Sequence, residues 1–187
     1  MGRSMFWTPG WAGKDAWNPS PSRGRMVSGS PGPALPRTPF SHPKAEVEGM
    51  PYPEMLVKPM RDDLVRIGFT ELRTPADVDQ VLGNETDSVL LVVNSVCGCS
   101  AGAARPGVYL SLQGEKKPAR LTTVFAGQDM DATDRARQYI VGYPPSSPAV
   151  ALFKDQELVF MMERHQIEGS TPHQIAAELQ AAYTEHC

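Results

Sequence analysis

The sequence predicts an α/β protein in which a central mixed β-sheet is sandwiched between helices. Three observations lead to this fold class. The segment "SVLLVV" (88–93) is short, β-branched and almost wholly apolar, as is typical of a central strand covered on both faces. A helix over roughly 97–112 then leads to a second strand, "RLTTVFA" (120–126). A hairpin at 149–162, "AVALFKDQELVFMM", and a closing helix complete the pattern.

The elements before the central strand begin at Tyr52. The stretch "YPEMLVKPMRDDLVRIGF" predicts a helix that Pro59 breaks or kinks, and its apolar side consists of Met55, Leu56, Met60, Leu64 and Ile67. "FTELRT" predicts a short edge strand. Thr74-Pro75 has the pattern of an N-cap followed by proline at the first helical position, and it opens the helix "PADVDQVL".

The elements after the second strand are equally regular. "MDATDRARQYI" predicts a helix with Asp131 near its start and arginines further along, in the sense that the helix dipole favours. The hairpin turns at Lys154-Asp155-Gln156. "STPHQIAAELQAAYTEH" closes the chain as an amphipathic helix that starts at Thr171-Pro172 and has one apolar face, formed by Ile175, Leu179 and Ala182.

Residues 1–49 differ in composition from the rest of the chain. They are rich in Pro, Gly and Ser, show no helical or strand period, and hold all three tryptophans. Such a segment cannot bury enough surface to offset its ordering entropy, so we expect a disordered extension. A targeting peptide, or a start codon placed upstream of Met26 or Met50, are the alternatives. Residues 50–187 form the predicted globular domain.

Composition limits the class of protein. The net charge of −3 argues against nucleic acid as the main partner, because phosphate binding needs a concentrated basic face. No apolar run approaches the roughly 20 residues of a membrane helix, so no membrane partner is expected. Three cysteines, two of them almost adjacent, do not form a structural disulfide framework. A reducing compartment such as the cytoplasm is therefore expected.

Cys97-Gly98-Cys99 stands where the central strand turns into a helix. A thiol at a helix start faces unpaired N–H groups and the positive end of the helix dipole, and both favour thiolate. Cys97 is therefore the expected nucleophile in thiol–disulfide exchange, and Cys99 the thiol that resolves the adduct. Gly98 is expected to supply the unusual backbone conformation that a Cys-X-Cys disulfide ring needs.

Two other interpretations of the cysteine pair remain open. Isolated cysteines in apolar stretches are usually small core residues. The pair could also supply two zinc ligands, although no second pair lies at ligand spacing; the remaining ligands would come from His165, His173, His186 or Cys187. Redox chemistry explains the glycine and the strand-to-helix position better than either alternative.

Two prolines bear on this site. Ser147-Pro148 stands directly before the strand "AVALF", where a proline has lost its ladder donor, and X-Pro is the bond type that readily becomes cis. We expect a cis bond here, and an ordinary turn in "GYPPSSP" is the alternative. Pro106 lies inside the predicted 97–112 helix and is expected to kink it.

From about Met50 to Cys187 the chain resembles the bacilliredoxin family, thioredoxin-like proteins with a Cys-Gly-Cys active site. The stretches that carry the resemblance are "VVNSVCGCSAGAARPG", "VFAGQD", "PPSSPAVALF", "RHQIEG" and the terminal "EHC". The resemblance implies a thioredoxin-like fold, in which a cis-proline at the position of Pro148 lies against the reactive thiol and, with Ser147, presents a backbone edge to the substrate. The long extension at 1–49 departs from the family.

The resemblance also implies an activity, the removal of bacillithiol from S-bacillithiolated proteins. Cys97 would take over the bacillithiol group, and either Cys99 or a second bacillithiol would release it. Bacillithiol is then a co-substrate, and no tightly bound cofactor is expected. A general disulfide oxidoreductase or isomerase, or a redox-sensing or metal-binding module without catalysis, are the alternatives. We expect a monomer or a weak dimer.

Several further residues have open roles. Arg105 could offer positive charge to a thiolate or to the carboxylates of bacillithiol, or it could be a solvated surface residue. Asn94 and Ser95 are expected to cap the helix. A hydrogen-bonded loop is expected between the hairpin and the last helix, at Arg164, His165 and Glu168, and contact with the substrate is the alternative. Cys187 belongs to the family's pattern, and it could be a third redox thiol, a dimer bridge or a bystander.

Overall fold

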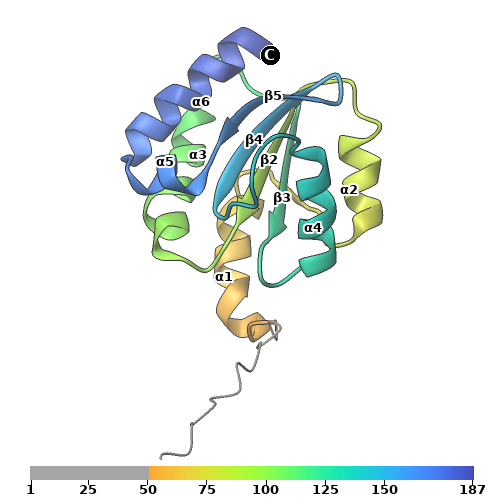
Figure 1. Cartoon of the computed structure of the whole chain (residues 1–187). Helices are drawn as coiled ribbons and strands as arrows, with labels where there is room; N and C mark the ends of the chain where they lie inside the picture. Colours follow the sequence, from red (N-terminus) through yellow and green to blue (C-terminus); the bar gives the residue numbers. More distant parts are fainter. Residues whose placement is uncertain (1–50) are drawn as a thin grey trace, which may run out of the picture. The chain divides into compact units, whose positions relative to one another are not determined.

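The computed structural model describes residues 51–187, and the extension predicted at 1–49 lies outside this range. A five-stranded mixed sheet has helices on both faces (Figure 1), so the predicted fold class is confirmed. The strand order is β1-β3-β2-β4-β5. The strands are β1 Thr70–Glu71, β2 Val89–Asn94, β3 Arg120–Phe125, β4 Ala149–Lys154 and β5 Glu157–Met162. β1, β2 and β3 run parallel to one another, and β4 runs antiparallel to its two neighbours, β2 and β5.

Alternate residues of the central strand β2 enter two separate cores. Leu90 and Val92 pack with the helices of one face: α1 (Glu54–Val65), α3 (Arg105–Ser111), α5 (Arg164–Glu168) and α6 (Pro172–His186). Leu91 and Val93 pack with the other face, covered by α2 (Pro75–Leu82) and α4 (Met130–Tyr139). Every residue of β2 is buried, which explains its apolar sequence.

The predicted caps and turn are confirmed. Thr74 accepts a hydrogen bond from the Asp77 N–H and begins α2, and Thr171 accepts one from the Gln174 N–H and begins α6; both form capping boxes. The hairpin turn has φ of 51° at Asp155 and 67° at Gln156, as a tight turn between antiparallel strands requires. The short edge strand β1 also lies where it was predicted.

Helix α1 differs from the prediction in its buried face and in its continuity. Met55 is 88% exposed and Leu56 is also exposed, whereas Val57, Arg61 and Leu64 are buried. Arg61 replaces an apolar residue on this face because two carboxylates neutralise it. The helix runs unbroken through Pro59, whose missing N–H spares only a carbonyl in the exposed first turn.

The segment after the cysteines is helical to Ser111, as predicted, but its first part has wider helical turns than an α-helix. Residues Ser100–Ala104 form a π-helical segment, η1, before α3 begins. Pro106 cannot donate to a carbonyl one turn earlier, and its ring would crowd that carbonyl. The wider turn relieves this crowding. The π-helical segment is the feature found before Pro106, and the kink expected there stays a prediction.

Gly107 marks the closest approach of α3 to α6. A Cβ at this position would lie 2.6 Å from Cγ2 of Ile175 and 3.2 Å from the Pro172 carbonyl oxygen. We expect Gly107→Ala to lower the free energy of unfolding by about 1–3 kcal/mol, because Ile175 is fully buried and stiff. Urea unfolding measures the change.

Gly102→Ala is the matched control, because a Cβ there meets nothing within 4 Å and the residue is exposed. It should leave the free energy of unfolding unchanged or raise it slightly. Equal midpoints for the two variants would show that α3 and α6 are not packed as closely as described.

Candidate active site

The cysteine pair and the Ser147-Pro148 loop lie at the same edge of the sheet. Val93 of β2 pairs with Ala149 of β4, and the two strands are antiparallel. The segment that follows β2 therefore lies beside the segment that precedes β4. The Ser147-Pro148 bond is cis, as predicted. Tertiary structure thus brings together two motifs that are about 50 residues apart in the sequence.

Cys97 and Cys99 are joined as a disulfide, with their Cα atoms 5.5 Å apart. Both side chains are half-buried and Gly98 between them is exposed, so the pair opens to the surface. The core-packing interpretation is therefore wrong. The expectation for Gly98 is also wrong in this disulfide form, because Gly98 lies in a helical turn without a positive φ, and a Cβ there would meet open space.

The sulfur of Cys97 is the acceptor at the start of the helical segment. It accepts hydrogen bonds from the Ser100 N–H at 3.3 Å and from the Ser95 hydroxyl at 3.3 Å. Asn94 and Ser95 were expected to cap the helix, but the cysteine takes this place three residues before the donor, as an N-cap side chain does. Both hydrogen bonds would favour a thiolate over a thiol at Cys97.

Arg105 is buried beneath this segment, with 7% of its surface exposed, so its interpretation as a solvated residue is wrong. Its Nη1 donates to Asn94 Oδ1 and to Ser100 Oγ, each at 3.1 Å, and its Nε pairs with Asp63 of α1 at 3.1 Å. Burial lowers the pKa of Arg105, and the neighbouring Asp63 carboxylate opposes this shift. The guanidinium therefore connects α1 to the segment that carries the cysteines.

A cavity of about 270 Å³ adjoins Arg105 between α1 and α3. The exposed Ala101 lies one turn after Cys97, and Arg105 lies about one turn after Ala101. All three residues are therefore on the same side of the helical segment. The lining residues are Asp63, Ile67, Ala101, Arg105, Pro106 and Tyr109. The cavity combines charged and apolar groups close to the disulfide.

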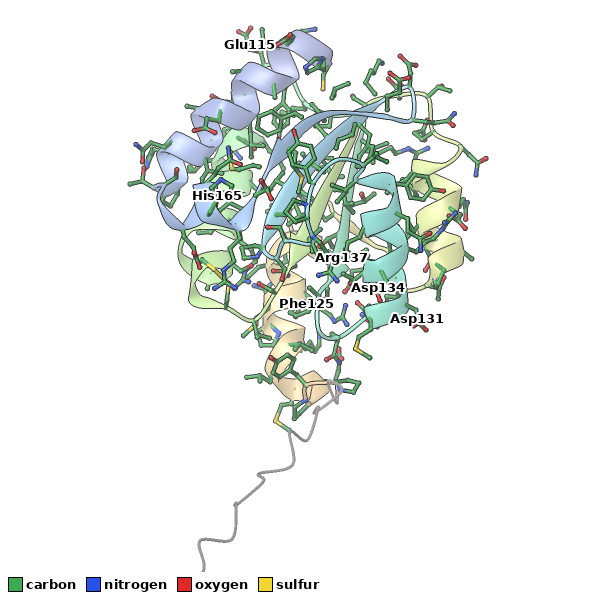
Figure 2. The ribbon with its side chains drawn as sticks, in the orientation of Figure 1. Glu115, Phe125, Asp131, Asp134, Arg137 and His165 are labelled. Carbon is green, nitrogen blue, oxygen red and sulfur yellow. A yellow bond between two sulfur atoms is a disulfide. The ribbon has the colours of Figure 1, made fainter. Side chains whose placement is uncertain are left out.

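The segment after the hairpin is a short helix, α5, rather than the expected loop. Its start has a capping box between Glu163 and Gln166, and Ile167 anchors it in the core. The Arg164 N–H donates to Ser146 Oγ at 2.8 Å, which holds α5 against the cis-proline loop. Figure 2 shows His165 on this helix, and its side chain is largely exposed. Sequence reasoning missed the helix because it is only one turn long.

Comparison with known proteins identifies the family. The model of the protein family described as Disulphide isomerase matches residues 52–187. A bacilliredoxin of Cytophaga hutchinsonii is 53% identical over 134 residues, covering 72% of this chain and 98% of the relative. Bacilliredoxins of Bacillus cereus and Koribacter versatilis are 50% and 48% identical, covering 71% and 73% of this chain and 91% and 94% of the relatives. The chain belongs to the bacilliredoxin family.

Membership of the bacilliredoxin family supports thiol–disulfide oxidoreductase chemistry for this chain. The range that the family model matches includes the disulfide, the cis-proline loop and α5, so the family match covers the whole candidate site. The resemblance found in the sequence motifs is thereby confirmed.

Cys187 of this bacilliredoxin-family chain lies far from the disulfide. It follows α6, where Tyr183 contacts Ser111 at the end of α3, whereas Cys97 precedes the start of the same helical segment. Ser111 follows Cys97 by 14 positions, which correspond to about 20 Å of helix. Figure 1 shows the C-terminus at the far end of α6 from α5. Direct exchange between Cys187 and Cys97 within one molecule is therefore not available in this fold.

Two findings concern only residues 51–187. Among them, no three or more His, Cys, Asp and Glu side chains gather in a way that could hold a metal ion, so His165, His173 and His186 do not complete a cluster with the cysteine pair. None of the helices in the same range is both long and apolar enough to span a membrane.

Proposed function

We propose that this protein is a thiol–disulfide oxidoreductase that removes bacillithiol from S-bacillithiolated proteins. One observation carries the proposal: the surface-accessible Cys97–Cys99 disulfide lies at the start of a helical segment, at the same sheet edge as the cis-proline loop. Its family, whose relatives are named bacilliredoxins, supports this substrate. The proposed compartment is the cytoplasm, where thiols are kept reduced.

The proposed reaction starts from the dithiol. The Cys97 thiolate attacks the bacillithiol sulfur of the mixed disulfide, and the client protein leaves as a thiolate that takes a proton from water. The Cys99 thiolate then attacks the sulfur of Cys97 and expels bacillithiol. The dithiol loses two electrons and the mixed disulfide gains them, which leaves the Cys97–Cys99 disulfide. Two further thiols return it to the dithiol.

The contacts around Cys97 support its role as the attacking sulfur. The Ser100 N–H and the Ser95 hydroxyl both donate to Cys97 Sγ, whereas no hydrogen bond to Cys99 Sγ is found in the described part of the chain. Hydrogen bonds of this kind favour the thiolate, which is the form that attacks a disulfide sulfur. Cys99, which lacks these donors, is the better resolving thiol.

The substrate contacts are proposals of the same kind. Ser147 and Pro148 would present backbone to the client protein, on the β4 side of the disulfide. Arg105 would offer its charge to a carboxylate of bacillithiol bound in the adjoining cavity. Asp63 already pairs with Arg105, so the carboxylate would share the guanidinium with it.

Trapping of the intermediate tests the proposed function. The reduced Cys99→Ser variant, exposed to a bacillithiolated protein, should gain the mass of one bacillithiol, and peptide mapping should place it on Cys97. The wild type should show no lasting adduct, because Cys99 releases it. An adduct on Cys99 of the wild type, or on Cys187, would contradict the assignment of roles.

A general disulfide isomerase is the second candidate, which the description of the matching family favours. The same model protein, loaded with bacillithiol or with glutathione, separates the two. We expect faster release of bacillithiol, measured by quantifying the freed thiol. Equal rates, together with correction of scrambled disulfides in a test protein, would support the isomerase instead.

A further inference from the structure

Asn94 occupies the end of β2, directly beneath the disulfide segment, and only 1% of its surface is exposed. Its Oδ1 accepts hydrogen bonds from the Ser95 N–H at 2.9 Å, from the Ser100 hydroxyl at 2.8 Å and from Arg105 Nη1 at 3.1 Å. An amide oxygen has two lone pairs, so three donors saturate it. The amide is therefore held in one orientation.

The other end of the amide fixes Asn94 to α1. Its Nδ2 donates to the Met60 carbonyl oxygen at 3.1 Å. This carbonyl belongs to an element 34 residues away in the chain, and it gives the amide a reference point outside the disulfide segment. An amide, with both an acceptor and a donor, is the group that makes all four contacts.

The partners of Asn94 are also the donors to the reactive sulfur. Ser95 and Ser100 are the two residues that donate to Cys97 Sγ. Asn94 binds the backbone of Ser95, whose hydroxyl reaches the sulfur, and the hydroxyl of Ser100, whose backbone N–H reaches the sulfur. In each serine, one polar group donates to the sulfur and the other donates to Asn94, so Asn94 fixes the position of both residues.

We infer that Asn94 is a positioning residue that aims these two donors at Cys97 and thereby keeps its thiol acidic. The inference rests on the proposed function, because it concerns the nucleophile assigned there. Asn94 does not touch the sulfur itself; it acts through its neighbours. An aspartate at this position would lose the donor to Met60 and would add a negative charge near the sulfur.

The charged groups around the network are Arg105 of α3 and Asp63 of α1, together with the Arg164–Glu168 pair of α5 beside the cis-proline loop. The Cys99 thiol is the titratable neighbour on the segment itself. Because Cys99 would complicate the titration, the measurement uses the Cys99→Ser background, with Cys187→Ser to leave one thiol.

The test compares Asn94→Ala and Asn94→Asp in this single-thiol background. The pKa of Cys97 is measured from the ultraviolet absorbance of the thiolate against pH, and the rate of alkylation by iodoacetamide is followed at a fixed pH below that pKa. We expect the alkylation rate to fall by about tenfold in Asn94→Ala, as loss of hydrogen bonds to a charged group predicts. Asn94→Asp should fall further because of its added charge.

Asn84→Ala is the matched control, because Asn84 caps the end of α2 through the Asp79 carbonyl, away from the disulfide. In this variant the pKa and the alkylation rate of Cys97 should equal those of the single-thiol protein that has Asn84. Should Asn94→Ala not fold, Ser100→Ala removes one hydroxyl of the network and is expected to slow alkylation several-fold.

An unchanged thiol pKa in folded Asn94→Ala, or in Ser100→Ala where the former does not fold, would overturn the inference. Neither readout uses bacillithiol. A raised pKa with no release of bacillithiol from any client would therefore overturn the proposed function and leave the role of Asn94 standing.

Discussion

Replacing Cys97 with serine is expected to reduce turnover of bacillithiolated proteins to the uncatalysed level. A serine hydroxyl is almost fully protonated at neutral pH and does not attack a disulfide sulfur, so no adduct forms. When Cys97→Ser is added to the Cys99→Ser variant, the trapped bacillithiol adduct should no longer form. Release of free bacillithiol from a loaded client, followed over time, measures the effect.

Two matched variants complete this test. Cys187→Ser should keep the wild-type rate, because Cys187 lies at the opposite end of the helical segment from the disulfide. Cys99→Ser should react once and then stop unless free bacillithiol releases the adduct. Full turnover by Cys97→Ser would contradict the proposed chemistry, because release of bacillithiol would then not depend on this sulfur. Uncatalysed rates in the wild type as well would favour a sensing module in which neither thiol is catalytic.

Arg61→Met is expected to lower the free energy of unfolding by about 3–5 kcal/mol. Arg61 is 5% exposed, and its guanidinium binds Glu71 of β1 and Asp129 after β3, each at 2.7 Å. Its Cζ also lies 5.1 Å from the ring centroid of Phe125, which Figure 2 shows at the end of β3. Methionine keeps the length of the side chain but leaves the largely buried Asp129 without this partner and Glu71 with Arg73 alone.

Arg66→Met is the control for this change, because Arg66 closes the same helix, is 71% exposed and lies 3.8 Å from Asp62. An exposed pair of this kind contributes about 0–1 kcal/mol. Chemical unfolding at neutral pH measures both variants. Equal midpoints would mean that the Arg61 cluster does not stabilise the carboxyl edge of the sheet.

The Arg61 effect should depend on pH. Burial alone would raise the pKa of Glu71, but hydrogen bonds from Arg73 and Arg61 outweigh it and lower the pKa below its ordinary value. A carboxyl whose pKa is lower in the folded state stabilises the fold above its unfolded pKa of about 4.3, and this contribution is lost as the pH falls through the folded value. The difference between wild type and Arg61→Met should therefore shrink in acid.

The chemistry of the site was predictable because it is local in sequence. Cys97 and Cys99 are separated by one residue, and the strand before them and the helix after them have clear periodicity. The Ser147-Pro148 bond was predictable for the same reason, since its signal is a proline directly before a strand. Thr74 and Thr171 likewise cap helices, because each side chain accepts a hydrogen bond from the N–H three residues further along.

The buried polar contacts were not predictable from the sequence. Arg105 and Asp63 are 42 residues apart, and Arg61 and Asp129 are 68 residues apart. Neither arginine has a local pattern that separates it from a solvated one. The prediction of the buried face of α1 was wrong for this reason, because hydrophobic periodicity counts a buried, paired arginine as a polar residue.

The sequence by itself determined the order of elements, the cysteine pair and the proline, because each depends on neighbours within a few residues. Only the tertiary structure decided that Asn94 lies beneath the pair, that Arg105 is buried beside it, and that Cys187 lies far from it. The physical reason is that burial and pairing of polar groups depend on which distant segments the sheet and helices bring together.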